Sequence, residues 1–137
     1  LAGLDHRHAN RTVIAMAMIE TRKALHNLDD ILSVPGLDAI YVGPADLALS
    51  LGKEPAGDPT DPVVLEAIEA IVAGARKHDI RAGIHTGSPD GAKRMIARGY
   101  QFVTIQADNA LLAGAARAAV GAMREGAAAG GKPAGPY

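Results

Sequence analysis

The sequence contains no cysteine and no tryptophan, and it has only one phenylalanine. The absence of cysteine excludes a disulfide scaffold, a zinc site with thiolate ligands and a thiol nucleophile. No run of about 18 apolar residues occurs, so a membrane-spanning helix is not expected. Fourteen Lys and Arg stand against fifteen Asp and Glu, and this balance argues against a protein that binds nucleic acid through a basic surface.

The remaining composition is that of a folded protein. Hydrophobic residues make up 48% of the 137 residues and charged residues 21%, which is too apolar and too weakly charged for a disordered chain. By length alone the chain fits one ordinary domain. We predict a folded region over residues 1–125 and a flexible tail, rich in Gly, Ala and Pro, over residues 126–137.

Strand-like and helix-like segments alternate along the chain. Short apolar runs predict strands buried on both faces at Thr12–Ile19, Leu37–Val42, Ile80–His85 and Gln101–Ile105. Helical spacing and capping residues predict helices at Arg22–Val34, Ala45–Leu51, Asp61 onward, Ser88–Arg98 and Asn109–Arg124. This alternation predicts an α/β protein with a parallel sheet and helices outside it.

Two acidic residues follow neighbouring strands of this predicted sheet. Glu20 follows the first strand, and Asp46 follows a Gly-Pro turn after the second. Taken singly, Glu20 can mark the point where the strand reaches solvent, and Asp46 can be an acid favoured at a helix N-terminus. Together they place two carboxylates on one rim, and such hard oxygen ligands suit Mg²⁺ or Mn²⁺.

Other groups at the same rim suggest a use for such a metal. The backbone N–H groups of Ala45 and Asp46 would lie at a helix N-terminus, which favours a small carboxylate. A metal chelated by an α-keto acid beside these amides could stabilise an enolate. His85 ends the third strand and is the general-base candidate by residue type, although a histidine at a strand end more often packs or hydrogen-bonds.

Several segments together resemble one known family. The residues concerned are Met18–Thr21, Asn27–Leu32, Gly36–Asp38 and Tyr41–Leu47, with Gly83–His85 and Ser88–Pro89 later in the chain. They closely resemble the HpcH/HpaI aldolases, the family of 4-hydroxy-2-oxoheptanedioate (2,4-dihydroxyhept-2-ene-1,7-dioate) aldolase. The likeness covers roughly residues 9–125, and the Glu-Thr segment combined with Gly-Pro-Ala-Asp-Leu is highly specific.

The resemblance implies a metal-dependent, class II pyruvate aldolase that cleaves 4-hydroxy-2-oxo acids to pyruvate and an aldehyde. It implies a TIM (β/α)8 barrel, with the four units of this chain as the C-terminal half, strands five to eight. The resemblance implies that Glu20 and Asp46 hold the metal. The expected metal is Mg²⁺ or Mn²⁺, and Co²⁺ and Zn²⁺ are alternatives. The Ala45 and Asp46 amides bind the pyruvate carboxylate. The family's catalytic His, Asp and Arg belong to the N-terminal half, so a catalytic role for His85 loses weight and this chain is expected to be a fragment.

Two other functions remain open at this stage. The first is a related carbon–carbon lyase of the citrate-lyase β-subunit or malyl-CoA type, which also uses a Glu/Asp metal pair. The second is a non-catalytic half-barrel that acts as an assembly partner, because four strands of a closed eight-strand barrel leave two open edges and an uncovered interior. The resemblance further implies a cytoplasmic homo-oligomer, commonly a hexamer, and a place in aromatic compound catabolism.

Overall fold

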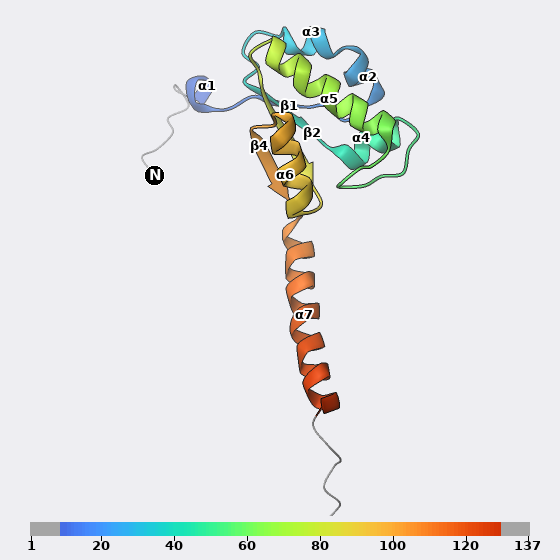
Figure 1. Cartoon of the computed structure of the whole chain (residues 1–137). Helices are drawn as coiled ribbons and strands as arrows, with labels where there is room; N and C mark the ends of the chain where they lie inside the picture. The colour runs from blue at the N-terminus through green and yellow to red at the C-terminus, as the bar shows by residue number, and fades with distance from the viewer. Residues whose placement is uncertain (1–8, 130–137) are drawn as a thin grey trace, which may run out of the picture. The chain divides into compact units, whose positions relative to one another are not determined.

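The structure is a computed structural model that describes residues 9–129 (Figure 1). The chain divides into two compact units, with the boundary between Ile105 and Gln106. No helix within residues 9–129 is long and apolar enough to cross a membrane.

The first unit is built on a four-stranded parallel sheet. The strands are β1 (Met16–Met18), β2 (Ala39–Val42), β3 (Arg81–Thr86) and β4 (Phe102–Ile105), in the spatial order β1-β2-β3-β4. Every neighbouring pair is parallel, which confirms the predicted α/β architecture. The prediction of a first strand beginning at Thr12 was wrong: Ala9–Thr12 forms the short helix α1. β1 pairs with β2 over three residue pairs, preceded by the hydrogen bond from Ala39 N to Ala15 O, so strand pairing begins only at Ala15.

Helices follow the first three strands of this unit. They are α2 (Arg22–His26), α3 (Leu28–Leu32), α4 (Pro44–Ser50), α5 (Pro62–Lys77) and α6 (Pro89–Arg98). The single helix predicted for residues 22–34 is divided at Asn27, whose backbone leaves the helical region (φ −97°, ψ 20°). Side chains cap three N-termini: Thr21 accepts from Ala24 N, Asp61 from Val63 N and Ser88 from Gly91 N.

The helices α2 to α6 pack on one face of the sheet, and within the described residues of this unit no helix covers the other face (Figure 1). On the covered face Ile40 and Ile84 are fully buried in a cluster with Ile68 and Ile71 of α5. On the opposite face the side chains of Met18 and Phe102 are about half exposed, at 50% and 51%. Within the described residues β1 and β4 each pair on one side only. The predicted uncovered interior and open sheet edges are therefore present.

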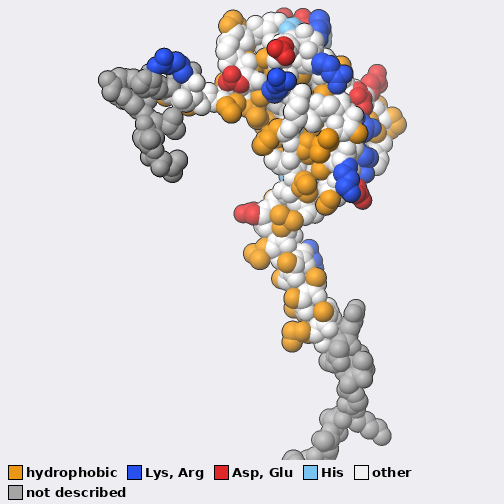
Figure 2. All heavy atoms as spheres, turned by 60° about the vertical axis from the view of Figure 1, so that its left-hand side comes forward, with side chains coloured by type: hydrophobic (Ala, Val, Ile, Leu, Met, Phe, Trp, Pro, Cys, Tyr) orange, Lys and Arg blue, Asp and Glu red, His pale blue; other side chains and the backbone are white. Residues whose placement is uncertain are grey.

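The second unit contains the helix α7 (Asp108–Ala129). It continues past Arg124, where the sequence pattern predicted its end, into three alanines, the residue type with the highest helix propensity. Large apolar side chains are exposed along it (Figure 2), namely Leu111, Leu112, Val120 and Met123. Residues 130–137, the rest of the predicted tail, lie outside the described residues.

Candidate metal and substrate site

Glu20 and Asp46 lie beyond the carboxyl ends of adjacent strands. The backbone N–H of Ile19 donates to Tyr41 O at 2.8 Å, so the pairing of β1 with β2 continues to the residue before Glu20. Asp46 is in the first turn of α4, which begins directly after Gly43. Parallel strands bring their carboxyl ends to one rim, and the fold therefore places both acids at that rim.

Gly43 lies beside both carboxylates. A Cβ placed on Gly43 would lie 2.7 Å from Glu20 Oε2 and 3.4 Å from Asp46 Oδ2. Because both distances start from one point, the two carboxylates face the same small space. Only glycine fits there without displacing Glu20, so the turn between β2 and α4 has a steric reason to contain it. The structure thus brings together the two residues that the sequence proposed as metal ligands.

The backbone beside Asp46 offers free hydrogen-bond donors. The first helical bond of α4 is donated by Leu47 N to Gly43 O, at 2.9 Å. The N–H groups of Ala45 and Asp46 precede it and have no partner within the helix, and Pro44 has no N–H group. Two amide donors therefore lie next to the paired carboxylates, as the sequence pattern predicted.

A concavity of about 220 Å³ opens at this point. It is lined by Met18, Tyr41, Gly43, Pro44, Ala45, Asp46 and His85. Met18 contributes an apolar surface, whereas Asp46 and His85 contribute polar groups. A small organic acid that contacts the amides of α4 would have His85 and Tyr41 along the same wall.

The carboxylate pair suits a hard divalent cation. Within residues 9–129 no group of three or more His, Cys, Asp or Glu is arranged to hold a metal ion. Two protein carboxylates are nevertheless what Mg²⁺ commonly takes, because it keeps several waters and accepts ligands from its substrate. The donor set therefore fits such a cation, with Glu20 and Asp46 as the protein ligands.

His85 is part of a hydrogen-bonded chain that the sequence reasoning missed. Its Nδ1 lies 2.9 Å from Thr104 Oγ1, and the same oxygen is hydrogen-bonded to Tyr41 Oη. The three residues come from β3, β4 and β2. Alternation along the predicted strands could have placed His85 and Thr104 on one face, but it could not have shown that Tyr41 reaches across the intervening strand.

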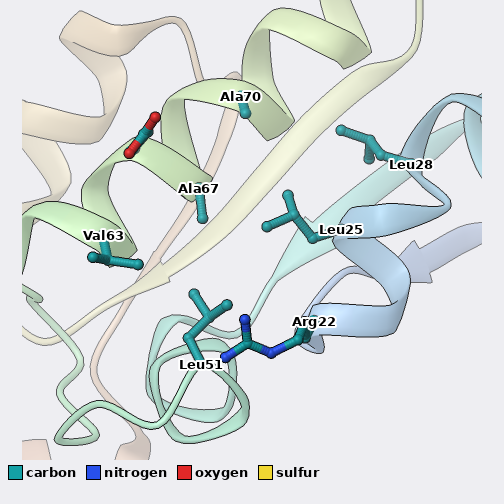
Figure 3. A pocket seen from close by; sticks show the side chains of 8 residues that line it. Arg22, Leu25, Leu28, Leu51, Val63, Ala67 and Ala70 are labelled. Carbon is teal, nitrogen blue, oxygen red and sulfur yellow. The ribbon is translucent and has the colours of Figure 1, made fainter.

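A larger cavity, of about 420 Å³, lies among the helices and away from these groups. Arg22 and Leu25 of α2 border it, together with Leu51 and with Val63 and Ala67 of α5. Figure 3 shows Leu25, Leu51 and Ala67 pointing into the same space. Its walls are mostly apolar and it lacks the paired carboxylates, so we place the candidate site at the smaller concavity.

The comparison with known proteins shows the family of the chain. A sequence profile of the family described as HpcH/HpaI aldolase/citrate lyase matches residues 3–115. The chain belongs to this family. The matched region contains all four strands and both candidate metal ligands.

Curated relatives are aldolases. The chain is 44% identical over 116 residues to the hydroxypyruvate/pyruvate aldolase of Rhizorhabdus wittichii, which covers 85% of this chain and 46% of the relative. It is 40% identical over 110 residues to the 4-hydroxy-2-oxo-heptane-1,7-dioate aldolase of Escherichia coli, covering 80% of this chain and 41% of that protein. The chain thus spans less than half the length of these relatives.

Solved structures of the family have the same fold. A HpcH/HpaI aldolase/citrate lyase family protein from Burkholderia cenocepacia superposes with a TM-score of 0.80 at 32% identity, over 86% of this chain and 45% of that one. A HpcH/HpaI aldolase from Desulfitobacterium hafniense superposes with a TM-score of 0.77 at 30% identity. The match covers 87% of this chain and 46% of that one. The four parallel strands therefore correspond to part of a TIM-barrel-like family fold.

Proposed function

We propose that this chain supplies the metal-binding half of a class II pyruvate aldolase. The observation that supports this most directly is that the carboxylates of Glu20 and Asp46 both lie close to Gly43. The named relatives act as pyruvate and 4-hydroxy-2-oxo acid aldolases, so the substrate class we infer is a 4-hydroxy-2-oxo acid.

In this proposal the chain binds one end of the substrate. Glu20 and Asp46 hold a divalent cation, which when bound acts as a Lewis acid on the 2-oxo group. The N–H groups of Ala45 and Asp46 donate to the C1 carboxylate and orient it. A base outside residues 9–129 takes the proton of the C4 hydroxyl group. The C3–C4 bond then breaks to give an aldehyde, and C3 takes up a proton to give pyruvate.

Calorimetric titration with Mg²⁺ or Mn²⁺, followed by pyruvate, tests the binding part of this proposal. We expect saturable metal binding by the parent and pyruvate binding that depends on the metal. Glu20→Ala and Asp46→Ala should each abolish both. Matched controls are Glu66→Ala on α5 and Asp30→Ala on α3, two exposed acids outside the concavity. Parent-like affinity in Glu20→Ala and Asp46→Ala would refute the site.

The metal preference is a separate part of the proposal. We infer Mg²⁺ or Mn²⁺ from the all-oxygen donor set, with Co²⁺ or Zn²⁺ as substitutes. Removal of metal with a chelator should abolish aldol cleavage in the complete enzyme. Adding each cation back separately and measuring the cleavage rate should then give the order of preference. Full activity after exhaustive chelation would exclude a metal-dependent mechanism.

A related lyase reaction is the second candidate. The matched family is described as aldolase/citrate lyase, and a Glu/Asp pair also suits a citrate-lyase β-subunit or malyl-CoA type enzyme. Cleavage of a CoA thioester, with no turnover of free 4-hydroxy-2-oxo acids, would favour that reaction. The small concavity beside Asp46 fits a free oxo acid, so we rank the aldolase first.

The uncovered sheet face supports a third hypothesis, in which the chain alone has no catalytic activity and acts as an assembly partner. Four strands with two open edges correspond to about half of the solved barrels. We expect the 137 residues alone to show no turnover with metal. Addition of an N-terminal half-barrel from a family member should restore cleavage, and turnover by the isolated chain would exclude this reading.

We also propose a homo-oligomer, with a hexamer as the expected form, and a cytoplasmic role in the catabolism of aromatic compounds. Exposed Leu112 and Met123 on α7 support the association, because a helix with large apolar side chains in solvent gains stability from a partner. Light scattering on the parent and on the double variant Leu112→Glu, Met123→Glu tests it. An unchanged mass in the variant would exclude α7 from the interface.

A further inference from the structure

We propose that His85 selects the aldehyde-derived part of the substrate by donating a hydrogen bond from Nε2 to an oxygen on it. In this inference Thr104 and Tyr41 are positioning residues that keep the His85 ring in the donating tautomer. The inference rests on the proposed function, because it takes the pyruvyl end of the substrate to lie against the amides of α4.

Gly83 lets Tyr41 reach the strand beyond its neighbour. Tyr41 on β2 lies opposite Gly83 on β3, and Gly83 lies opposite Phe102 on β4. A Cβ on Gly83 would lie 2.8 Å from Tyr41 Cδ2 and 3.0 Å from Phe102 Cδ1. Adjacent strands are about 4.8 Å apart, so a side chain crosses one strand only where that strand has no side chain of its own. Tyr41 therefore contacts Thr104 two strands away.

The protons in this chain of three groups can be assigned. Thr104 Oγ1 is hydrogen-bonded both to Tyr41 Oη and to His85 Nδ1, but it has a single proton to donate. The phenol is the stronger donor and the weaker acceptor of the two hydroxyl groups, so Tyr41 donates to Thr104. We infer that Thr104 then donates its own proton to Nδ1, which places the proton of a neutral His85 ring on Nε2.

This donor is not used by the protein. Within residues 9–129 we find no protein group that accepts a hydrogen bond from His85 Nε2, whereas Nδ1 lies 2.9 Å from Thr104 Oγ1. His85 also lines the concavity that contains Asp46 and Ala45. Thr104 and Tyr41 thus hold the His85 ring through Nδ1, and Nε2 is the ring nitrogen left for a ligand in this concavity.

The position of His85 defines the class of aldehyde. With the carboxylate and 2-oxo group of the substrate at Asp46 and Glu20, the carbons from C4 onward extend along the remaining wall, to which His85 and Tyr41 contribute. An N–H donor there favours an aldehyde with an oxygen acceptor beyond its carbonyl carbon. The inference therefore predicts a preference for hydroxylated aldehydes over alkyl aldehydes of equal size.

Aldol addition of pyruvate to two aldehydes of four heavy atoms tests this on the complete enzyme. Glycolaldehyde has a hydroxyl group where propionaldehyde has a methyl group. We expect the parent to prefer glycolaldehyde in kcat/KM, and His85→Leu to lower that preference about tenfold, the loss expected for one hydrogen bond in a site built for it. His85→Gln retains an N–H at a position similar to Nε2 and should keep part of the preference.

The positioning residues have matched variants. Thr104→Val removes the hydroxyl group at constant shape and should reduce the preference as His85→Leu does, while Thr104→Ser should restore it. Tyr41→Phe should act in the same direction, whereas Tyr100→Phe, which loses a hydroxyl group on the helix-covered side, should leave the preference unchanged. Long-range ¹H–¹⁵N spectra should show the Nε2–H tautomer of neutral His85 in the parent and the Ser variant, and a mixture in the Val variant.

The results separate this inference from the proposed function. Exchange of the pyruvate methyl protons with D₂O reports the pyruvyl end alone. A parent that shows no metal-dependent exchange overturns the proposed function. A parent that exchanges these protons, but whose aldehyde preference is the same in His85→Leu, overturns only the role of His85. An Nδ1–H tautomer in the parent overturns the assigned direction of the hydrogen bonds and the role of Thr104 with it.

Discussion

Glu20, in the segment after β1, and Asp46, on α4, both bring a carboxylate oxygen close to the Cα of Gly43. Glu20 Oε2 lies 2.7 Å and Asp46 Oδ2 lies 3.4 Å from the place where a Cβ of residue 43 would be. Like charges this close repel each other, and a divalent cation between them removes that repulsion. This arrangement supports the proposal that the pair holds a divalent cation.

Replacement of Gly43 by alanine should disturb this pair without removing a charge. The new methyl group would overlap Glu20 Oε2, so the carboxylate must turn away and the affinity for Mn²⁺ should fall about tenfold or more. Calorimetric titration with Mn²⁺ measures the change. Gly114→Ala on α7 is the control, because a Cβ there meets nothing within 4 Å. Equal Mn²⁺ affinity in Gly43→Ala and the parent would contradict the geometry.

The loop between α4 and α5 is held at the N-terminus of α6 by Asp58. Gly87 N donates to Asp58 Oδ1 at 3.0 Å, and a Cβ on Gly91 would lie 1.9 Å from the same oxygen. Gly91→Ala should displace Asp58, cost about 1–3 kcal/mol and speed tryptic cleavage at Lys53 in that loop. Limited proteolysis with mass spectrometry measures it. A cleavage rate equal to that of the parent would show that Asp58 does not restrain the loop.

Tyr100 should make the protein sensitive to alkali. Burial raises the pKa of Tyr100, and its hydroxyl group donates to Ile68 O at 2.9 Å. The unfolded chain releases this proton near pH 10, while the folded chain keeps it. The contribution of protonated Tyr100 to the free energy of unfolding is therefore complete below about pH 10. As the pH rises further, the free energy of unfolding falls by up to about 1.4 kcal/mol per pH unit.

Urea unfolding at pH 8 and pH 10.5 tests this for the parent and Tyr100→Phe. At pH 8 the free energy of unfolding of the variant should be about 1 kcal/mol lower than that of the parent, because the hydrogen bond is missing. Between pH 8 and pH 10.5 the variant should lose less stability than the parent. Equal losses in both proteins between the two pH values would exclude Tyr100 as the source of the alkaline sensitivity.

Asp29 connects α3 to the end of α5. Its Oδ1 lies 2.7 Å from His78 Nε2 and 3.0 Å from Lys77 Nζ. The hydrogen bond from His78, followed by Lys77, holds the pKa of Asp29 below its ordinary value of 3.8. The stabilisation is therefore present above pH 3.8 and is lost as the pH falls through the lower folded-state value.

Asp29→Asn should reduce the loss of stability that the protein shows at acid pH. Melting temperatures at pH 6 and pH 3 should differ less in this variant than in the parent. Asp30→Asn serves as the control, since the neighbouring carboxylate lies on the same short helix and has no ion pair among the described residues. A parent-like drop in the Asp29 variant would show that the pair contributes nothing to acid sensitivity.

The order of strands and helices could be predicted because hydrophobic spacing is a local property. Apolar runs predicted the last residues of β2 and β4, Val42 and Ile105, and their first residues to within two positions. The Asp61-Pro62 and Ser88-Pro89 pairs marked the starts of α5 and α6. Elements whose extent depends on a partner were predicted less well. Strand β1 is shorter than its apolar run because β2 offers only three partner residues.

By itself, the sequence determined that Glu20 and Asp46 follow adjacent strands, since parallel strands bring their ends to one rim. Only the tertiary structure decided how side chains distant in the chain meet there. The Tyr41–Thr104 bond joins residues 63 positions apart and crosses β3 where Gly83 leaves room. The physical reason is that strand register and the close approach of side chains are set by packing between elements, which local periodicity does not encode.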